Sequence, residues 1–256
     1  MTGCEEEWID SGSRLGLPLP EGVRRVTIVA SSSKEVALPM ATAETKIRLG
    51  PDMNGVLLTP EEFDAVEDYD ENYRYELIHG VLVVNPLPLE ASVGPNEMLA
   101  HWLLDYQQRH PKGSALNLTL PERYIRTRDS RRLADRVIWA GLGRLPNWRK
   151  EHPTIAVEFV SARRRDRERD YIDKRRDYMA IKIKEYWIVD RFQRTMTVIR
   201  YRPRRPQELV VREKEIYRTP LLPGFELSLR RLLAVADMLV EPQEVVSHAA
   251  RKPPNR

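Results

Sequence analysis

The chain has 256 residues, a length that suits one ordinary domain with extensions or at most two domains. Its 41% hydrophobic residues can form a core, and its 31% charged residues favour solubility. The formal net charge of +4 and the pI of about 9.2 make the chain mildly basic, which indicates a polyanionic partner only if the charge is clustered. Cys4 is the only cysteine, which excludes an internal disulfide and a cysteine-based zinc cluster.

The two ends of the chain lack sustained periodicity. Residues 1–55 are expected to form a loosely ordered N-terminal extension, with a poorly packed edge element around residues 26–30 as the alternative. Residues 239–256 are expected to be a disordered C-terminal tail. The acidic start has neither a basic nor an apolar segment, so we expect no signal peptide. No apolar run approaches the ~20 residues that span a bilayer, and a cytoplasmic location is the expectation.

The first half of the central domain, residues 56–238, contains clear helix and turn signals. Thr59 can cap a helix, Pro60 suits its first turn, and Glu61 and Glu62 favour its positive end. Alternating apolar residues with His79-Gly80 between them predict a strand that turns. The predicted elements are a short helix from Pro60, the turning strand 75–84, a helix over 97–108 and a strand over 118–125.

The second half reads as strands joined by a basic helix. The predicted strands cover residues 133–140, 154–160 and 185–190, followed by a hairpin of 195–201 and 209–217. An arginine-rich helix is expected over 164–182, and a final helix over 229–239. Strands, a crossover helix and further strands predict an α/β fold with a mixed β-sheet flanked by helices.

Two of the predicted central strands each carry one carboxylate. Strand alternation places Glu158 on a face with Ala156 and Val160, and Asp135 on a face with Val137. A charged carboxylate in such apolar surroundings is costly unless a metal ion or a basic partner compensates it. The alternative to a metal site is an ion pair with one of the nearby arginines, which are Arg131, Arg132 and Arg136. The two acids together favour a metal site.

A divalent-metal site of this kind needs few protein groups. Mg²⁺ takes one or two carboxylates together with water and phosphate oxygens, and it activates water for hydrolysis. A lysine can orient the water or stabilise the transition state, and Lys174 on the basic helix is the candidate. On spacing alone, Lys174 reads more readily as a surface partner of Asp170, four residues before it.

Six segments resemble one known family in their order and spacing. They are YELIHGVLV, LADRVIW, AVEFVS, RDYIDKRRDY, EYWIVD and LPGFELSL. From about Leu58 to about Ala236 the chain resembles the Uma-two family, bacterial restriction-endonuclease-like proteins of the PD-(D/E)XK nuclease superfamily. The resemblance implies a restriction-endonuclease-like fold and an endonuclease site that uses Mg²⁺ or Mn²⁺ to hydrolyse phosphodiester bonds in DNA.

The resemblance also assigns roles to four residues. Glu76 in YELIHG, Asp135 in LADRVIW and Glu158 in AVEFVS are expected to hold the metal and to be catalytic. The superfamily pattern has a lysine two residues after the second acid, but Val160 stands there. The resemblance implies that this lysine has moved to the following helix, as Lys174.

The chain departs from the family pattern at two further places. Ala134 replaces the proline that usually precedes the aspartate, which should have a mild effect because that proline shapes the strand. A histidine is usual at the start of the first long helix. Pro95 and Asn96 stand there instead, with His101 further along. If that histidine takes part in catalysis, its absence weakens the activity. Val160, Ala134 and the high arginine content keep a catalytically inactive protein of the same fold as an alternative.

Basic residues cluster on either side of the proposed site. Residues 163–177 hold eight basic and five acidic residues, and further clusters are Arg126, Arg128, Arg131, Arg132, Arg200, Arg202, Arg204 and Arg205. Arginine matches two phosphate oxygens, so these clusters are expected to contact nucleic acid. The family resemblance implies that this nucleic acid is DNA, and the residues themselves do not distinguish DNA from RNA. The alternative is a solvated helix face with internal ion pairs.

Three hypotheses therefore stand beside one another. The leading one is a metal-dependent endonuclease, and the alternative is an inactive nuclease-fold protein that binds nucleic acid or acts as a scaffold. The third is an oligomerising protein without a nucleic-acid partner. A homodimer is an expectation from the resemblance, because restriction nucleases are commonly dimers, and no membrane partner is expected.

Overall fold

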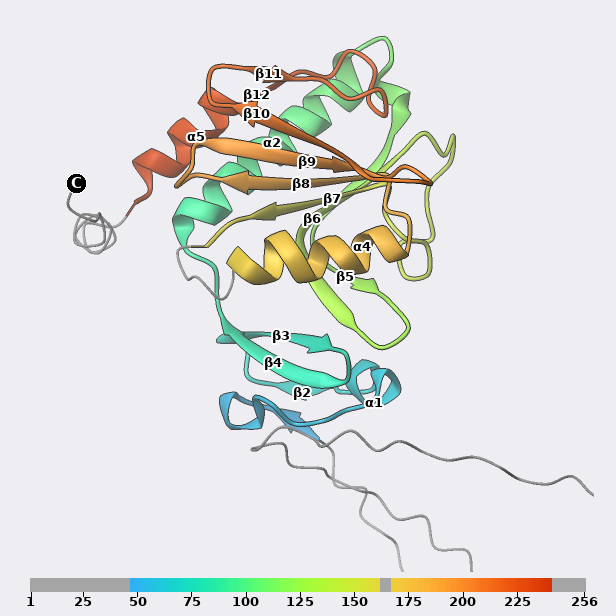
Figure 1. The fold of residues 1–256 in the computed structure, drawn as a ribbon, viewed down its shortest axis with the longest axis vertical. Coiled ribbons are helices and arrows are strands. Elements are labelled where there is room, and N and C mark those ends of the chain that lie inside the picture. Colours follow the sequence, from blue (N-terminus) through green and yellow to red (C-terminus); the bar gives the residue numbers. More distant parts are fainter. Residues whose placement is uncertain (1–46, 162–166, 241–256) are drawn as a thin grey trace, which may run out of the picture.

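The computed structural model describes residues 47–161 and 167–240, which form a mixed α/β fold around one large sheet (Figure 1). The elements are β1 (Arg48–Leu49), η1 (Pro51–Met53), α1 (Pro60–Asp64), β2 (Asp68–Tyr69), β3 (Tyr73–Ile78), β4 (Val81–Pro86), α2 (Glu90–Arg109), η2 (Gly113–Ala115), β5 (Leu116–Arg126), β6 (Arg131–Ala140), β7 (Ile155–Phe159), η3 (Arg169–Lys174), α4 (Arg175–Ala180), β8 (Glu185–Asp190), β9 (Thr195–Arg200), β10 (Gln207–Arg212), β11 (Ile216–Tyr217), β12 (Leu227–Ser228) and α5 (Leu229–Met238).

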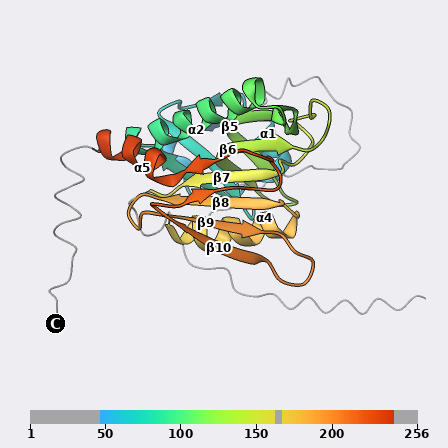
Figure 2. The same ribbon diagram turned by 90° about the horizontal axis from the view of Figure 1, so that it is seen from above.

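The large sheet has eight strands in the order β10-β9-β8-β7-β6-β3-β4, and β5 pairs with β6. Only β7 and β8 run parallel to each other in it, and the crossover between them contains η3 and α4. Figure 2 shows α4 on one face of the sheet and α2 with α5 on the other. The predicted mixed sheet flanked by helices is confirmed.

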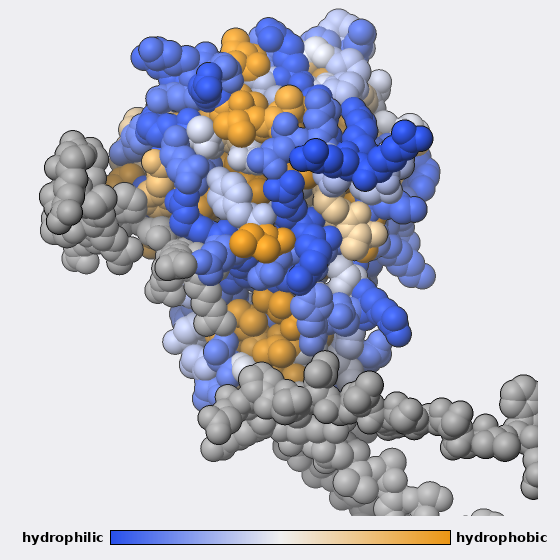
Figure 3. Space-filling view, in the orientation of Figure 1, coloured by the Kyte–Doolittle hydropathy of each residue, from blue (hydrophilic) through white to orange (hydrophobic). Residues whose placement is uncertain are grey.

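Strand alternation divides the core between the two faces. Ile155, Val157 and Phe159 pack with α2 and α5, whereas Ala156 and Val160 pack on the side of α4. The predicted faces of this strand are therefore confirmed. Figure 3 shows the face that carries α4 as largely hydrophilic, with separate apolar patches. That face offers charged groups, rather than one broad apolar surface, to a partner.

Local signals near the start of the domain act as the sequence predicts. The Thr59 hydroxyl accepts a hydrogen bond from the backbone N–H of Glu62, whose carboxylate accepts one from the backbone N–H of Thr59. This capping box starts α1. The strand predicted over 75–84 is the β3–β4 hairpin, and its turn places His79 at φ 49° and Gly80 at φ 80°. Two successive positive φ angles are typical of a two-residue hairpin turn.

Helix α2 begins at Glu90, seven residues before the predicted start, and Pro95 lies inside it. The prediction started the helix after Pro95 because proline favours the first turn of a helix. Packing against α5 explains the difference. A side-chain carbon on Gly94 would lie 2.3 Å from the Leu239 side chain, so this turn of α2 lies close against the C-terminal helix. Tertiary burial therefore extends the helix past its proline.

Two other predicted elements are wrong in extent. The basic helix expected over 164–182 has its first three residues outside the described part, and it ends at Ala180 after the π-helical segment η3. The strand expected over 209–217 is interrupted by a turn at residues 213–215. Its second part, β11, pairs with β12 in a separate small sheet.

The predicted extensions lie largely beyond the described residues. Residues 1–46 and 241–256 are outside them, including the edge element expected at 26–30. Residues 47–55 contain β1 and η1, and Leu49 is buried in the core below β3 and β4. No helix in the described ranges is long and apolar enough to cross a membrane.

Candidate active site

The candidate site lies where β6 and β7 stop pairing. Their register runs from Ile138 opposite Ile155 to Arg136 opposite Val157. Beyond Arg136, β6 turns toward β3, and Arg131 pairs with Leu77 there. The two strands therefore diverge at the positions of Asp135 and Glu158. Where two strands diverge, their backbone N–H and C=O groups lose their inter-strand hydrogen bonds, and side chains must replace these partners.

Asp135 satisfies one of these backbone groups. Its Oδ2 accepts a hydrogen bond of 2.7 Å from the backbone N–H of Phe159, in the place of a carbonyl of a neighbouring strand. Its Oδ1 lies 3.7 Å from Nη1 of Arg74, and the side chain is 21% exposed. The ion pairs with Arg131, Arg132 or Arg136 that were the alternative for Asp135 are not the ones observed. Asp135 keeps an oxygen facing the opening between the strands.

Glu158 is buried on the face that carries α4. Its Oε2 lies 2.9 Å from Nζ of Lys174, and its Oε1 accepts a hydrogen bond of 3.2 Å from the Tyr178 hydroxyl. Burial raises the pKa of Glu158 well above its usual value, and the charges of Asp135 and Asp170 raise it further. The charge of Lys174 lowers the pKa of Glu158, but burial outweighs it.

Lys174 lies in the middle of the acids. Its ammonium donates to the backbone carbonyl of Leu133 at 2.8 Å and lies 3.7 Å from Oε1 of Glu76 and 3.6 Å from Oδ1 of Asp170. Burial acts to lower its pKa, but the charges of Glu158, Glu76 and Asp170 outweigh burial and raise it. Lys174 is therefore charged at any physiological pH. It is the last residue of η3, and π-helical turns are frequent at functional sites.

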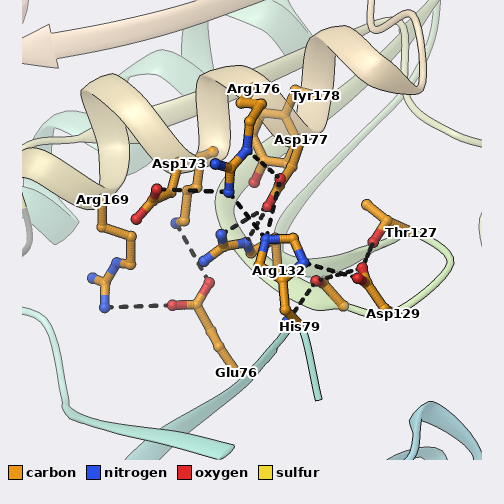
Figure 4. A network of polar contacts seen from close by, with 12 residues as sticks. Glu76, His79, Thr127, Asp129, Arg132, Arg169, Asp173, Arg176, Asp177 and Tyr178 are labelled. Carbon is orange, nitrogen blue, oxygen red and sulfur yellow. Dashed lines mark hydrogen bonds and ion pairs between the residues drawn. The ribbon is translucent and has the colours of Figure 1, made fainter. Parts of the chain in front are cut away.

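Glu76 joins the cluster from β3. Its Oε1 accepts a hydrogen bond of 2.9 Å from the backbone N–H of Leu133, and its Oε2 lies 3.5 Å from Nη1 of Arg169 (Figure 4). Burial would raise the pKa of Glu76, but the charges of Lys174, Arg169 and Arg132 lower it below its usual value. Glu76 is thus a fully ionised acid in the same cleft.

Asp170 is an acid that sequence reasoning did not place in the site. The spacing to Lys174 was noticed, but it suggested a surface pair, whereas both side chains are almost completely buried. Burial raises the pKa of Asp170 to about 6, and the nearby Asp135 and Glu76 charges contribute. A buried i,i+4 pair cannot be distinguished from an exposed one by its spacing.

These groups line one cleft of about 230 Å³. Its polar lining consists of Arg74, Glu76, Asn85, Ser92, Asp135, Glu158, Ser161, Arg169, Asp170, Lys174 and Arg191. The structure therefore brings all four residues singled out in the sequence, Glu76, Asp135, Glu158 and Lys174, into one place. The cleft also contains Arg169 from the basic stretch 163–177, and Arg74 and Arg191, which sequence reasoning missed because they come from separate elements far apart in the chain.

A second polar network lies beside the cleft (Figure 4). Nε of the buried Arg132 donates to Oδ2 of Asp177 at 2.7 Å, and this pair joins β6 to α4. The rim of the network is exposed, with Nδ1 of His79 lying 2.9 Å from Asp129 and its Nε2 lying 3.1 Å from Arg176. The network fixes α4, and with it the end of η3, against the sheet.

The predicted basic groove is partly wrong because two of its arginines are internal. Arg132 is fully buried and forms an ion pair with Asp177. Arg131 is almost fully buried, and its Nε and Nη2 donate hydrogen bonds to the carboxylate of Asp64. In the last cluster, Arg200 pairs with the buried Glu185. For these arginines, the alternative of internal ion pairs is correct.

The helix position where the family usually has a histidine holds Asn96. Its Nδ2 donates a hydrogen bond of 2.9 Å to the backbone carbonyl of Asp135. Its Oδ1 accepts a hydrogen bond of 2.7 Å from Nε of the buried Arg136. His101 is exposed on α2. Asn96 thus fixes the backbone that carries Asp135 and does not face the carboxylates.

The carboxylates meet the needs of a hard divalent cation only in part. In the described ranges, no three His, Cys, Asp or Glu side chains stand together as a ready metal cluster. Mg²⁺, however, needs only one or two carboxylates beside water and phosphate. Asp135 and Glu158, which both line the cleft, are the carboxylates that could supply these. Lys174 supplies a charge at Glu158 but leaves Asp135 open to the cleft.

Comparisons with known proteins identify the family and the fold of this chain. A family model with the description "Putative restriction endonuclease" (Uma2) matches residues 60–230, more than half of the chain. A crystal structure of a "putative nuclease belonging to DUF820" from Anabaena variabilis superposes with a TM-score of 0.53 at 15% identity, covering 70% of this chain and 99% of that one. No curated protein matches the chain. The chain belongs to the Uma2 family and has the restriction-endonuclease-like fold of a nuclease.

Proposed function

We propose that this chain is a metal-dependent endonuclease that hydrolyses phosphodiester bonds in DNA. The observation that carries the proposal is the meeting of Asp135, Glu158 and Lys174 in one cleft at the divergence of β6 and β7. Two acids and a lysine are the groups that such hydrolysis needs, because the substrate is an anion and the nucleophile is water.

Each residue has a role that follows from its position. Asp135 and Glu158 would hold Mg²⁺ or Mn²⁺, which supplies an activated water and neutralises charge on the phosphate when bound. The carboxylate of Glu76 lies 3.7 Å from the Lys174 ammonium and fixes the position of that ammonium. Through this contact Glu76 belongs to the site. Lys174 lies 2.9 Å from Glu158, where it can orient the attacking water or stabilise the developing negative charge.

Lys174 can supply the positive charge that the superfamily pattern expects at the position of Val160. Val160 is buried and packs among the core residues on the α4 side, so no charged side chain could replace it without cost. The ammonium of Lys174 reaches the acid of the same strand from η3 instead. This supports a catalytic lysine supplied by the helix.

The test is a cleavage assay on labelled DNA, with RNA of the same sequence as a second substrate, in Mg²⁺ and in Mn²⁺. We expect Asp135→Asn and Glu158→Gln to lose at least about a hundredfold in rate, because each removes charge at the reacting centre. Asp173→Asn is the matched control. It also removes one carboxylate charge, but Asp173, next to Lys174 in the chain, has a side chain that is 44% exposed. Unchanged rates in both site variants would refute the proposal.

The inactive alternative is favoured by one observation. The Lys174 ammonium already occupies the space between three of the acids, as a built-in cation. If that arrangement is permanent, the fold binds nucleic acid without hydrolysis. The distinguishing result is DNA binding that needs no metal, survives Asp135→Asn and is accompanied by no cleavage with any divalent ion.

A further inference from the structure

Trp148 is one of the few large aromatic side chains on the surface of the described residues. Its side chain is 40% exposed, and it lies in the loop of residues 141–153 between β6 and β7. Two guanidinium groups lie over its ring, that of Arg149 at 4.9 Å from the ring centre and that of Arg123 at 5.4 Å. An exposed indole next to two cations is a surface that a partner with flat rings and negative charge would cover.

The loop that carries Trp148 is held in one shape. The Glu151 carboxylate pairs with both terminal nitrogens of Arg144, at 2.9 and 2.7 Å, and accepts a hydrogen bond of 2.7 Å from the backbone N–H of Asn147. These contacts lower the pKa of Glu151 to about 2. The backbone carbonyl of Glu151 also accepts a hydrogen bond from the buried Trp139. Trp148 therefore sits on a turn that is already ordered before any partner binds, which reduces the entropy cost of binding.

The positive charge beside Trp148 is not neutralised locally. The carboxylate of Glu122, next to Arg123, pairs with Arg74, and that of Glu151 pairs with Arg144. Within the described ranges, neither Arg123 nor Arg149 forms an ion pair with a carboxylate. The two guanidiniums are thus available to an external anion.

Arg123, whose guanidinium lies over the indole, is on the strand next to the one that carries Asp135. Arg123 on β5 is paired with Ala134 on β6, the residue before Asp135. A strand spacing of about 4.8 Å and a rise of about 3.4 Å put the Cα atoms of Arg123 and Asp135 roughly 6 Å apart. Paired residues share a face, and Ala134 packs on the α4 side of the sheet, as does the face of Glu158. Arg123 therefore places one cation of the Trp148 surface next to the strand that carries Asp135 into the cleft.

We propose that Trp148, with Arg123 and Arg149 beside it, is a stacking site for an unpaired base of the nucleic acid that enters the cleft. The proposal rests on the proposed function and specifies its substrate as nucleic acid with a single-stranded segment beside the cleavage point. Only an unpaired base exposes a whole face to an indole, because the bases of a duplex are stacked on one another. The arginines contact the phosphates on either side of that base.

The test measures binding and not cleavage. Fluorescence anisotropy in EDTA follows a labelled single-stranded oligonucleotide of about 16 nucleotides and the duplex of the same sequence. We expect Trp148→Ala to weaken single-strand binding roughly 5- to 150-fold and duplex binding much less. Trp148→Phe keeps a ring and should restore most of the affinity, a result that a merely structural role would not give.

The matched control is Leu145→Ala, because Leu145 is 71% exposed on the same loop and carries no ring or charge. Its single-strand affinity should equal that of the wild type. Arg149→Ala should weaken both nucleic acids and reduce the salt dependence of binding by about one unit of slope.

The outcomes separate this proposal from the proposed function. Equal single-strand affinities of Trp148→Ala and the wild type, with metal-dependent cleavage intact, overturn the stacking site and leave the nuclease standing. A wild type that binds neither nucleic acid in EDTA overturns the stacking site, and one that also cleaves neither in Mg²⁺ or Mn²⁺ overturns both. Loss of affinity that Trp148→Phe does not restore also overturns the stacking site.

Discussion

Lys174 is expected to stabilise the fold strongly, in addition to its role in the site. Its ammonium lies within 4 Å of Glu158, Glu76 and Asp170, and all four side chains are almost completely buried. The substitution Lys174→Met keeps the length of the side chain and removes the charge. Breaking a buried ion pair from one side costs about 3–5 kcal/mol, and here three acids lose their shared cation.

The size of this loss should depend on pH. Burial already raises the pKa values of Glu158 and Asp170, and loss of Lys174 raises them further. A group with a raised folded-state pKa contributes stability below its unfolded-state pKa, and the contribution is lost as the pH rises through the folded-state pKa. The variant should therefore be most destabilised near pH 8 and recover part of its stability near pH 5, where the acids take up protons.

Urea unfolding followed by far-UV circular dichroism at the two pH values measures the effect, with the slope against urea as the check on two-state behaviour. Lys112→Met is the control, because Lys112 is exposed and its substitution should change the unfolding free energy by less than about 0.5 kcal/mol. If Lys174→Met unfolds like this control, or loses the same free energy at both pH values, the argument for a buried and mutually repelling acid cluster is refuted.

Three further predictions concern stability. Asp177→Ala should cost about 3–5 kcal/mol in urea unfolding, because it leaves a fully buried arginine without its acid; a loss below about 1 kcal/mol would contradict this. Gly224→Ala should be more destabilising in thermal unfolding than Gly143→Ala, because both glycines have positive φ but only at Gly224 would the added carbon lie 2.4 Å from the His110 ring; equal losses would count against the close packing. Asp170→Asn removes a group whose pKa is raised to about 6, so its unfolding free energy relative to the wild type should increase by about 2–3 kcal/mol between about pH 4 and pH 7; a constant difference would show that Asp170 titrates normally.

The sheet was predictable because its signals are local. Strand alternation alone places Glu158 on the α4 face, and the structure puts it there with Val160. The capping box at Thr59 and the turn at His79-Gly80 likewise depend on residues within one turn of each other. The limits of α2 were not predictable in this way, because packing of Gly94 against Leu239, which lies far away in the sequence, extends the helix past a proline.

The site was predictable only in part. Spacing placed Asp135 and Glu158 on neighbouring strands, but the assignment of Glu76 and Lys174 depended on the family resemblance. Periodicity cannot tell the inner face from the outer face of a helix that is charged on all sides, which is why Asp170 was taken for a surface residue.

The arginines show that the sequence also does not predict which charges are neutralised in the folded chain. A sequence reveals a cluster, but not which members are neutralised inside the protein. Arg131 and Arg132 stand side by side in such a cluster and both pair with acids of the chain, Asp64 and Asp177, whereas Arg74 stands alone in the sequence and lines the cleft. The partners of all three lie on other elements, so only the folded chain identifies them.

The central claim is that Asp135 and Glu158 bind a divalent metal together. Calorimetric titration of Mn²⁺ into the wild type, Asp135→Asn and Glu158→Gln, with a short phosphorothioate oligonucleotide present to supply the phosphate, tests it most directly. The account predicts a bound metal in the wild type that both substitutions abolish or greatly weaken. Binding that is unchanged in both variants, or absent from the wild type at millimolar metal, would contradict it.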